Sequence, residues 1–193
     1  QDFDTKTTSD FKSFLTAAKS GGAQGIYAGA TSGTKGCVPR GQMKDVFTTD
    51  IFYMGPDGIS NTQCISDSGS MANDKMYSSV AAADANQNPA AKPTIDAYTK
   101  AYPNKNDLGS YTFASYDCAA ILIDAIGRAI DSAGGKMPTR KQVVDAVAQT
   151  KDFQGTTGTY TFDKNGDPTQ PTMAIFNLKG TSWAFVKQFA VGG

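Results

Sequence analysis

The sequence of 193 residues predicts an α/β fold that begins with a parallel sheet and continues into a block of helices. Three features support this prediction. Short apolar segments alternate with helical segments up to residue 82, which is typical of parallel strands joined by helices. Residues 89–150 then show helical spacing almost throughout. Near the carboxyl terminus, two alternating segments can pair as a hairpin.

The first elements are a helix, a short strand and a loop. Ser9 or Asp10 can cap the helix, whose apolar positions follow helical spacing: Phe11, Phe14, Leu15 and Ala18. Gly21-Gly22 ends this helix. Residues 25–30 are typical of a short buried strand, and the small residues at 31–36 predict a loop.

A second helix and two further strands complete the predicted sheet. The helix passes through Met43, Val46 and Phe47 and leads to an apolar strand at residues 51–54. Strand, helix and strand in this order indicate parallel pairing. The next strand is predicted at residues 76–82.

The helical block follows a small, polar linker at residues 83–89. Helices are predicted at 94–102, at 113–133 and after Thr139, which can cap the third. The long helix is apolar at Ala119, Ala120, Leu122, Ile123, Ile126 and Ile130, and the third helix bears Val143, Val144 and Val147. Because the block has almost no strands, its apolar faces lack a sheet to pack against.

The tail changes to strand-like alternation. Residues 158–162 predict a strand, and Pro168–Pro171 a second linker before a hairpin of residues 172–178 and 183–189. Between them, Asp163, Asn165 and Asp167 resemble the start of a calcium-binding loop. Pro168 follows, however, and Ala174 stands where that loop needs Glu, so the Asn-Gly pair favours a turn.

Composition excludes several function classes. The chain has 18 basic and 18 acidic residues and no basic run, so it does not resemble a nucleic-acid binder. It has no histidine, which excludes Ser-His-Asp and Cys-His catalysis and histidine-ligated zinc. No metal or other cofactor is expected. No apolar run approaches membrane-spanning length.

The three cysteines are interpreted separately. Cys37 and Cys64 each follow a predicted strand at the same edge of the sheet, so we predict a disulfide, with two reduced buried thiols as the alternative. Cys118 lies in the apolar long helix and is expected in the core. The chain begins with Gln1 rather than Met, so we expect either removal of an N-terminal segment or a fragment.

Two strand ends carry the candidate binding residues. Asp57 follows an apolar strand through Gly55-Pro56, and a carboxylate there suits a small cationic group; the alternative is a simple turn residue. The loop at 29–36 lacks the Walker spacing, because Gly36 follows Lys35, but its backbone N–H groups and hydroxyls can hold a small polar or anionic group. The aromatic residues Tyr111, Phe113 and Tyr116 are either packing residues or a wall over a ligand.

Taken together, the segments resemble the carboxyl-terminal half of a type I periplasmic solute-binding protein, within the leucine/isoleucine/valine-binding family of ABC importers. The resemblance rests on residues 10–22, 25–30, Gly55-Pro56-Asp57-Gly58, 111–117, 153–158 and 162–167. It implies two flavodoxin-like lobes with parallel sheets that close on a ligand. It places residues 1–84 and the hairpin at 170–193 in the second lobe, and residues 85–169 in the first lobe, whose sheet belongs mainly to the missing amino-terminal half.

The resemblance also implies roles for single residues. Asp57 matches the acidic residue that pairs with the ligand's ammonium, and Phe113 matches an aromatic contact from the first lobe. Thr31, or its neighbours Ala30 and Ser32, falls where the branched-chain binders often have Tyr. Thr31 departs from that pattern and predicts a roomier or more polar pocket.

The expected function is therefore capture of a small amino acid or related compound for an ABC permease. The protein would not be an enzyme. It would be exported to the periplasm or the extracellular space, free or held by a lipid anchor. Two alternatives remain: a receptor domain with the same fold, and an α/β hydrolase or lyase with Asp57 as general base. The absence of histidine and of a nucleophile elbow disfavours the enzyme.

Overall fold

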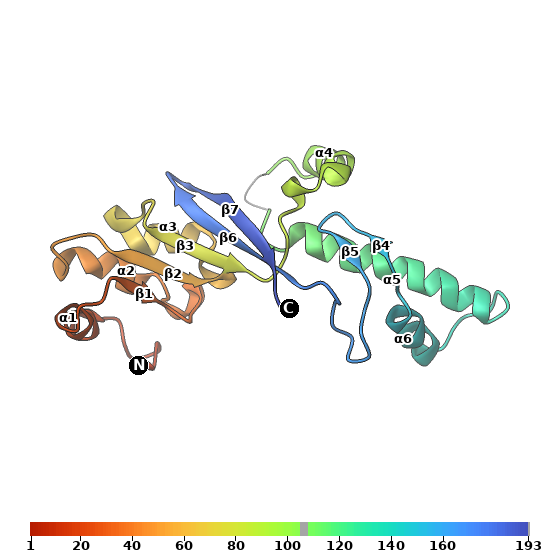
Figure 1. The fold of residues 1–193 in the computed structure, drawn as a ribbon, viewed down its shortest axis with the longest axis horizontal. Coiled ribbons are helices and arrows are strands. Elements are labelled where there is room, and N and C mark those ends of the chain that lie inside the picture. Colours follow the sequence, from red (N-terminus) through yellow and green to blue (C-terminus); the bar gives the residue numbers. More distant parts are fainter. Residues whose placement is uncertain (105–107, 193) are drawn as a thin grey trace. The chain divides into compact units, whose positions relative to one another are not determined.

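The computed structural model describes residues 1–104 and 108–192. The chain folds into two compact units (Figure 1). Unit 1 comprises Gln1–Val80 and Ala174–Lys187, and unit 2 comprises Ala81–Met173 and the residues from Gln188 onward. Among the described residues, no helix is long and apolar enough to cross a membrane.

Unit 1 is built on a five-stranded sheet of mixed direction. In spatial order its strands are β1 (Gly25–Tyr27), β2 (Phe52–Pro56), β3 (Met76–Val80), β6 (Thr172–Lys179) and β7 (Ser182–Ala190). The predicted parallel pairing is confirmed, since β1 runs parallel to β2 and β2 to β3. The predicted hairpin is also present, and its strand β6 pairs antiparallel with β3. Both β1 and β3 end earlier than predicted; beyond Tyr27, the N–H of Ala30 bonds to the carbonyl of Ala28, which turns the chain.

Three helices pack on one face of this sheet: α1 (Lys12–Ser20), α2 (Val38–Gln42) and α3 (Thr62–Ser68). The cap position of α1 falls on Phe11, which makes no side-chain bond, one residue after the predicted Asp10. Asp10 still bonds the start of the helix, since its carboxylate accepts from the N–H of Lys12. The helix predicted through residues 43–47 is also misplaced. Pro39 suits the first turn of α2, which continues into a 3-10 turn at Met43–Asp45.

A continuous apolar core lies between the helices and the sheet. Its buried members are Leu15, Ile26, Cys37, Met43, Tyr53, Ile59, Cys64, Met76 and Leu178. Tyr53 is the largest of the apolar members, and its hydroxyl donates to the carbonyl of Gly36. Burial raises the pKa of Tyr53, so the phenol stays protonated and keeps this bond.

Arg40 is fully buried in unit 1 and is paired on every side. Its guanidinium donates to Asp50 through Nη1 at 2.6 Å and through Nη2 at 3.1 Å. It also donates to the carbonyls of Met71 and Ile51 and to Asn73 Oδ1. Burial alone would raise the pKa of Asp50, but hydrogen bonds from Arg40 and Asn73 outweigh it and hold that pKa below its ordinary value. Together these bonds join α2 to the segments that precede β2 and β3.

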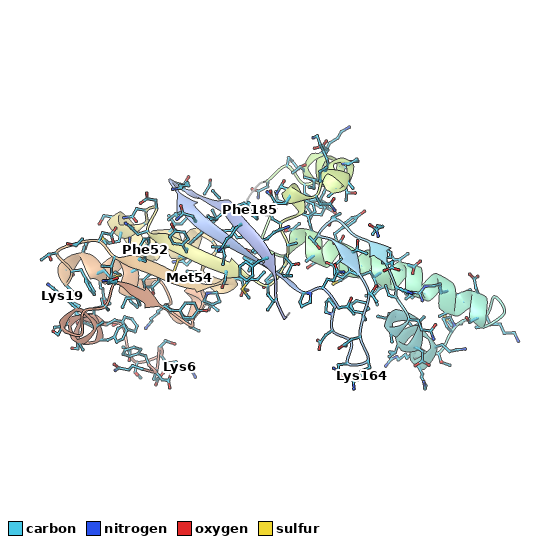
Figure 2. All side chains as sticks on the ribbon, viewed as in Figure 1. Lys6, Lys19, Phe52, Met54, Lys164 and Phe185 are labelled. Atoms are coloured by element: carbon cyan, nitrogen blue, oxygen red, sulfur yellow. A yellow bond between two sulfur atoms is a disulfide. The ribbon has the colours of Figure 1, made fainter. Side chains whose placement is uncertain are left out.

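Side chains of β1 and β2 are exposed to solvent, and β1 forms an edge of the sheet. Tyr27 is 62 % exposed. Phe52, whose side chain is labelled in Figure 2, is 50 % exposed. Among the described strands, β1 pairs only with β2, through bonds that use Gln24 and Ala28. The backbone groups of Gly25 and Tyr27 therefore point away from β2. A cavity of about 410 Å³ lies along this edge, between β1 and a segment that includes Phe3.

In the described residues of unit 2, three α-helices accompany a small sheet. The helices are α4 (Lys92–Ala101), α5 (Thr112–Ser132) and α6 (Arg140–Ala148), and the paired strands are β4 (Phe153–Gln154) and β5 (Thr159–Tyr160). Thr139 caps α6 through a capping box with Gln142, as predicted. The predicted turn at 163–167 is present, and Asp163 accepts from the N–H groups of Asn165 and Asp167.

The long helix α5 buries a narrow face and exposes its most apolar one. The buried residues recur every fourth position: Asp117, Ile121, Ala125 and Ala129. Leu122, Ile123 and Ile126 are 48 %, 72 % and 40 % exposed, as expected for an apolar face without a sheet. The core position predicted for Cys118 is wrong, because this side chain is exposed and its neighbour Asp117 is buried instead.

Candidate functional site

Two neighbouring strand ends in unit 1 bring Thr31 and Asp57 together. The loop after β1 carries Thr31, and β2 leads through Pro56 into the 3-10 turn Asp57–Ile59. A Cβ atom on Gly58 would lie 2.5 Å from Thr31 Cγ2, so the two segments are in close contact at this glycine. Because the carboxyl ends of parallel strands form the usual ligand crevice of α/β folds, this pair marks a candidate site.

Asp57 presents a carboxylate that no described residue bonds. Its side chain is half-buried, and no hydrogen bond or ion pair from the described part of the chain reaches it. Gly55 allows the strand end to pack tightly, since a Cβ there would lie 2.8 Å from Ile59 Cδ1 and 3.0 Å from the carbonyl of Ala28. The backbone around Asp57 is thus held in place while its charge remains available to a cation.

The hydroxyl of Thr31 is used inside its own loop. Thr31 caps the 3-10 turn Ser32–Thr34, and its Oγ1 accepts from the N–H of Thr34 at 3.2 Å. Thr34 returns the contact by accepting from the N–H of Thr31. Thr31 is exposed, whereas the neighbouring candidates Ala30 and Ser32 are half-buried. Hydrogen bonds of its own therefore hold the loop, and Thr31 forms part of its exposed surface.

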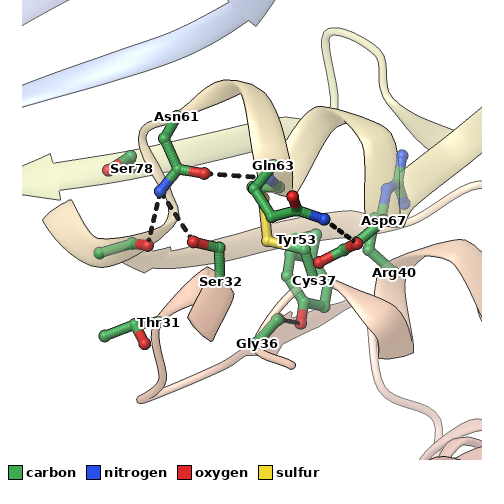
Figure 3. The surroundings of a disulfide bond; sticks show 12 residues. Thr31, Ser32, Gly36, Cys37, Arg40, Tyr53, Asn61, Gln63, Asp67 and Ser78 are labelled. Atoms are coloured by element: carbon green, nitrogen blue, oxygen red, sulfur yellow. Dashed lines mark hydrogen bonds between the residues drawn. A yellow bond between two sulfur atoms is a disulfide. The ribbon is translucent and has the colours of Figure 1, made fainter. Parts of the chain in front are cut away.

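Asn61 is a residue of this region that the sequence analysis missed. It caps α3 through Oδ1, which accepts from the N–H of Cys64 at 3.0 Å. Its Nδ2 donates to Ser32 Oγ and to the carbonyl of Gly58, each at 3.0 Å (Figure 3). An Asn three residues before Cys64, at the start of a helix, was the available signal, since Asn is a preferred cap.

The predicted disulfide between Cys37 and Cys64 is present and fully buried (Figure 3). It joins Cys37, which directly precedes α2, to Cys64 in α3, with the two Cα atoms 5.2 Å apart and 27 residues of separation. The loop that carries Thr31 ends at Cys37, and the segment that carries Asp57 leads into the helix of Cys64. The cross-link therefore lies directly behind both candidate segments.

Replacing both Cys37 and Cys64 with Ala is expected to lower the free energy of unfolding by about 3.5 kcal/mol, because the unfolded chain regains the entropy of a loop of this length. Urea unfolding without reductant measures this loss. The matched control is Cys118→Ala, which removes an exposed thiol and is expected to leave the unfolding midpoint unchanged. Equal midpoints for the double variant and the wild type would contradict the prediction.

Phe113 lies in unit 2, in the first turn of α5, and is described with that unit. Its ring packs edge-on against Tyr98, with ring centroids 5.6 Å apart. Its carbonyl accepts from the hydroxyl of Thr156 at 3.2 Å. Tyr111 and Tyr116, the other aromatic residues predicted at this helix start, are more than one third exposed. Phe113 is thus half-buried and fixed by neighbours on α4 and on the loop after β4.

Asp117 anchors that loop to α5. Its carboxylate accepts from the N–H and hydroxyl of Thr156 and from the N–H and hydroxyl of Thr157, at 2.6 to 2.8 Å. Gly155 is required beside it, since a Cβ there would lie 2.7 Å from Asp117 Oδ2. Because Asp117 lies one turn after Phe113, the loop also fixes the start of the helix. The part of the chain that the structure describes contains no group of three or more potential metal ligands.

Comparison with known proteins identifies the family of this chain. The family model described as periplasmic binding protein matches residues 1–182. A Leu/Ile/Val-binding protein homolog 3 of Brucella melitensis biotype 1 is 29 % identical over 168 residues, which cover 86 % of this chain and 42 % of that protein. The chain therefore spans less than half the length of this curated relative.

Solved structures share the fold. A leucine-binding protein from Thermotoga maritima superimposes with a TM-score of 0.77 at 22 % identity, covering 95 % of this chain and 49 % of that one. A branched-chain amino acid transporter substrate-binding protein from Streptococcus pneumoniae, in complex with isoleucine, gives 0.73 at 20 % identity, with coverage of 96 % and 49 %. A solute-binding protein from R. palustris in complex with benzoate gives 0.68 at 17 % identity, with coverage of 97 % and 49 %.

Proposed function

The chain belongs to the periplasmic binding protein family, and from this premise we propose that it forms about half of a solute-binding protein that captures an amino acid for an ABC importer. The relative from Brucella melitensis is named as a Leu/Ile/Val-binding protein homolog, which supports an amino-acid ligand. The protein binds and releases its ligand without chemical change. Two lobes close on the ligand by a hinge motion, with hinge segments near residues 83–89 and 168–171.

The observation that carries this proposal is the unpaired carboxylate of Asp57. A half-buried carboxylate without a partner in the described chain is ready to bind a cationic group. The ammonium of an amino acid supplies both the charge and N–H donors, and such charge-assisted bonds are the strong ones. Thr31, with Ala30 and Ser32, shapes the wall beside the ligand. Phe113 packs against the ligand from the other lobe.

The same proposal explains the exposed apolar face of α5, which we expect a sheet from the rest of the complete protein to cover. Leu122, Ile123 and Ile126 form an apolar stripe on this helix, and helices of α/β folds bury such stripes against a sheet. We assign the sheet to the amino-terminal half that the longer relatives possess, because this chain covers 42 % of the curated relative. That half also supplies the groups that hold the ligand's carboxylate. The second partner is the membrane permease of the importer.

The proposed site of action is the periplasm or the extracellular space. The family is described as periplasmic, and the buried disulfide between Cys37 and Cys64 suits an oxidising compartment. The proposal includes a lipid anchor on the complete protein, which would keep the protein near the permease.

Titration calorimetry on the complete protein tests the function. The ligands are L-leucine, L-isoleucine, L-valine and L-phenylalanine, with 4-methylpentanoate and benzoate as compounds that lack an ammonium group. We expect at least one of the amino acids to bind and 4-methylpentanoate to bind at least about 100-fold more weakly than L-leucine, because it leaves Asp57 unpaired. Tight binding of benzoate with no binding of amino acids would overturn the proposal.

A further inference from the structure

We propose that Asn61 is a positioning residue of this binding site, which holds the Thr31 loop and the Asp57 turn at a fixed separation. This inference rests on the proposed function. The two segments follow different strands, and the Asn61 amide is bonded to both, through Ser32 Oγ on one side and the carbonyl of Gly58 on the other. Asn61 therefore sets the distance between the pocket wall and the ligand's charged anchor.

Every hydrogen-bonding atom of the Asn61 side chain described above has a partner of the right kind. Oδ1 accepts from the N–H of Cys64, and the two N–H bonds of Nδ2 are donated to two oxygens. A flipped amide would place Oδ1 against the carbonyl oxygen of Gly58 and Nδ2 against an N–H group, and both contacts are repulsive. The orientation is therefore fixed by the neighbours, and the amide acts as a rigid spacer.

The two tasks of Asn61 can be separated by substitution. Ser and Asp are both good cap residues, so either keeps an oxygen for the N–H of Cys64 and preserves the start of α3. Neither side chain has the N–H₂ group that joins Ser32 to Gly58. Asn61→Ser and Asn61→Asp thus remove the positioning role while retaining the structural one. If one of the two variants fails to fold, the other still tests the positioning role.

The remaining contacts of the two segments do not replace this link. In the described part of the chain, the hydrogen bonds of Thr31 stay within its own loop, to Thr34 and to the N–H of Gly36, and its contact with Gly58 is apolar. The disulfide fixes Cys37 to Cys64, which lie beyond the ends of both segments. Loss of the amide link therefore leaves the loop and the turn free to separate by small amounts. Displacements of this size weaken ligand contacts strongly.

The test measures L-leucine affinity of the complete protein by titration calorimetry. We expect Asn61→Ser and Asn61→Asp to raise the dissociation constant about tenfold, with the thermal midpoint shifted by no more than about 2 °C. The matched control is Gln63→Ala on the same helix, whose amide bonds only to Asp67 at the surface. That variant is expected to bind like the wild type.

A double-mutant cycle separates positioning from a general structural role. In a Ser32→Ala background the amide has already lost one of its two acceptors, so Asn61→Ser is expected to raise the dissociation constant by clearly less than tenfold. Backbone amide exchange at Thr34 and Gly36 is expected to quicken in Asn61→Ser and to stay unchanged in Gln63→Ala. Unchanged affinity together with unchanged exchange in both Asn61 variants would overturn the inference.

The outcomes keep this inference distinct from the proposed function. If the wild type binds none of the amino acids, the proposed function is wrong, and the exchange rates at Thr34 and Gly36 still decide whether Asn61 holds the loop. A second outcome is that the wild type binds an amino acid, but the effects of Asn61→Ser and Ser32→Ala on the dissociation constant are fully additive. The proposed function then stands, and the positioning role through Ser32 is refuted.

Discussion

Replacing Asp57 with Asn is expected to weaken amino-acid binding by the complete protein by at least about 100-fold, because the ligand's ammonium loses a charged partner inside a closed, water-poor site. The change preserves the size and shape of the side chain. Stability is expected to be unaffected, since no described residue bonds the carboxylate of Asp57. Titration calorimetry with L-leucine measures the affinity, and thermal unfolding measures the stability.

The matched control for this variant is Asp67→Asn. Asp67 lies in the same unit, on α3, and its carboxylate bonds the exposed amide of Gln63. Its neutralisation changes the net charge by the same amount and is expected to leave L-leucine affinity unchanged. A second check uses 4-methylpentanoate, whose affinity is expected to rise in Asp57→Asn because the unpaired negative charge is gone. Equal L-leucine affinity in Asp57→Asn and the wild type would refute the role of Asp57.

Arg40→Met is expected to lower the free energy of unfolding by about 3 to 5 kcal/mol, because it leaves the partly buried Asp50 without its bidentate partner. The carbonyls of Met71 and Ile51 lose a donor in the same step. Met resembles the aliphatic part of Arg in length, so the loss reports mainly on polar pairing rather than on an empty space. Urea unfolding followed by near-ultraviolet circular dichroism measures it.

Two comparisons show whether the lower free energy of unfolding in Arg40→Met comes from the buried position of the Arg40–Asp50 pair. Lys12→Met removes a cation from an exposed pair with Asp45, and its unfolding midpoint is expected to stay near that of the wild type. The pKa of Asp50 lies below its ordinary value in the folded protein, so its contribution is present above the unfolded carboxyl pKa and is lost as the pH falls through the folded one. Asp50→Asn is therefore expected to show a smaller loss of stability below about pH 4 than the wild type. A large effect of Lys12→Met would contradict this account.

Much of the fold could be predicted from local patterns. Alternation of short apolar strands with helices predicted the parallel pairing of β1, β2 and β3, and the Thr139 cap and the Asn165-Gly166 turn were visible in the sequence. These features depend on residues close together in the chain. The disulfide could be predicted for a related reason, since two parallel strand ends meet at the same edge of a sheet.

Features that depend on distant neighbours could not be predicted in this way. Composition alone placed Cys118 in the core, whereas the buried face of α5 is set by Asp117, whose carboxylate meets the loop at Thr156 and Thr157. In the same way, Asn61 became visible only through its partners Ser32 and Gly58. Long-range hydrogen bonds leave almost no periodic signal. The roles of Asp57, Thr31 and Phe113 stay predictions until binding is measured.

The exposed edge strand β1 has a consequence for the solubility of the 193-residue chain when it is purified without the rest of the protein. Outward backbone groups at Gly25 and Tyr27, beside the exposed rings of Tyr27 and Phe52, offer a template for any extended segment. At the concentrations used for purification, the nearest such segments belong to other molecules of the same kind, so we expect the edge to favour aggregation. A lysine in place of Tyr27 would protect the edge in the way that natural sheets protect theirs, and would make the purified material easier to concentrate.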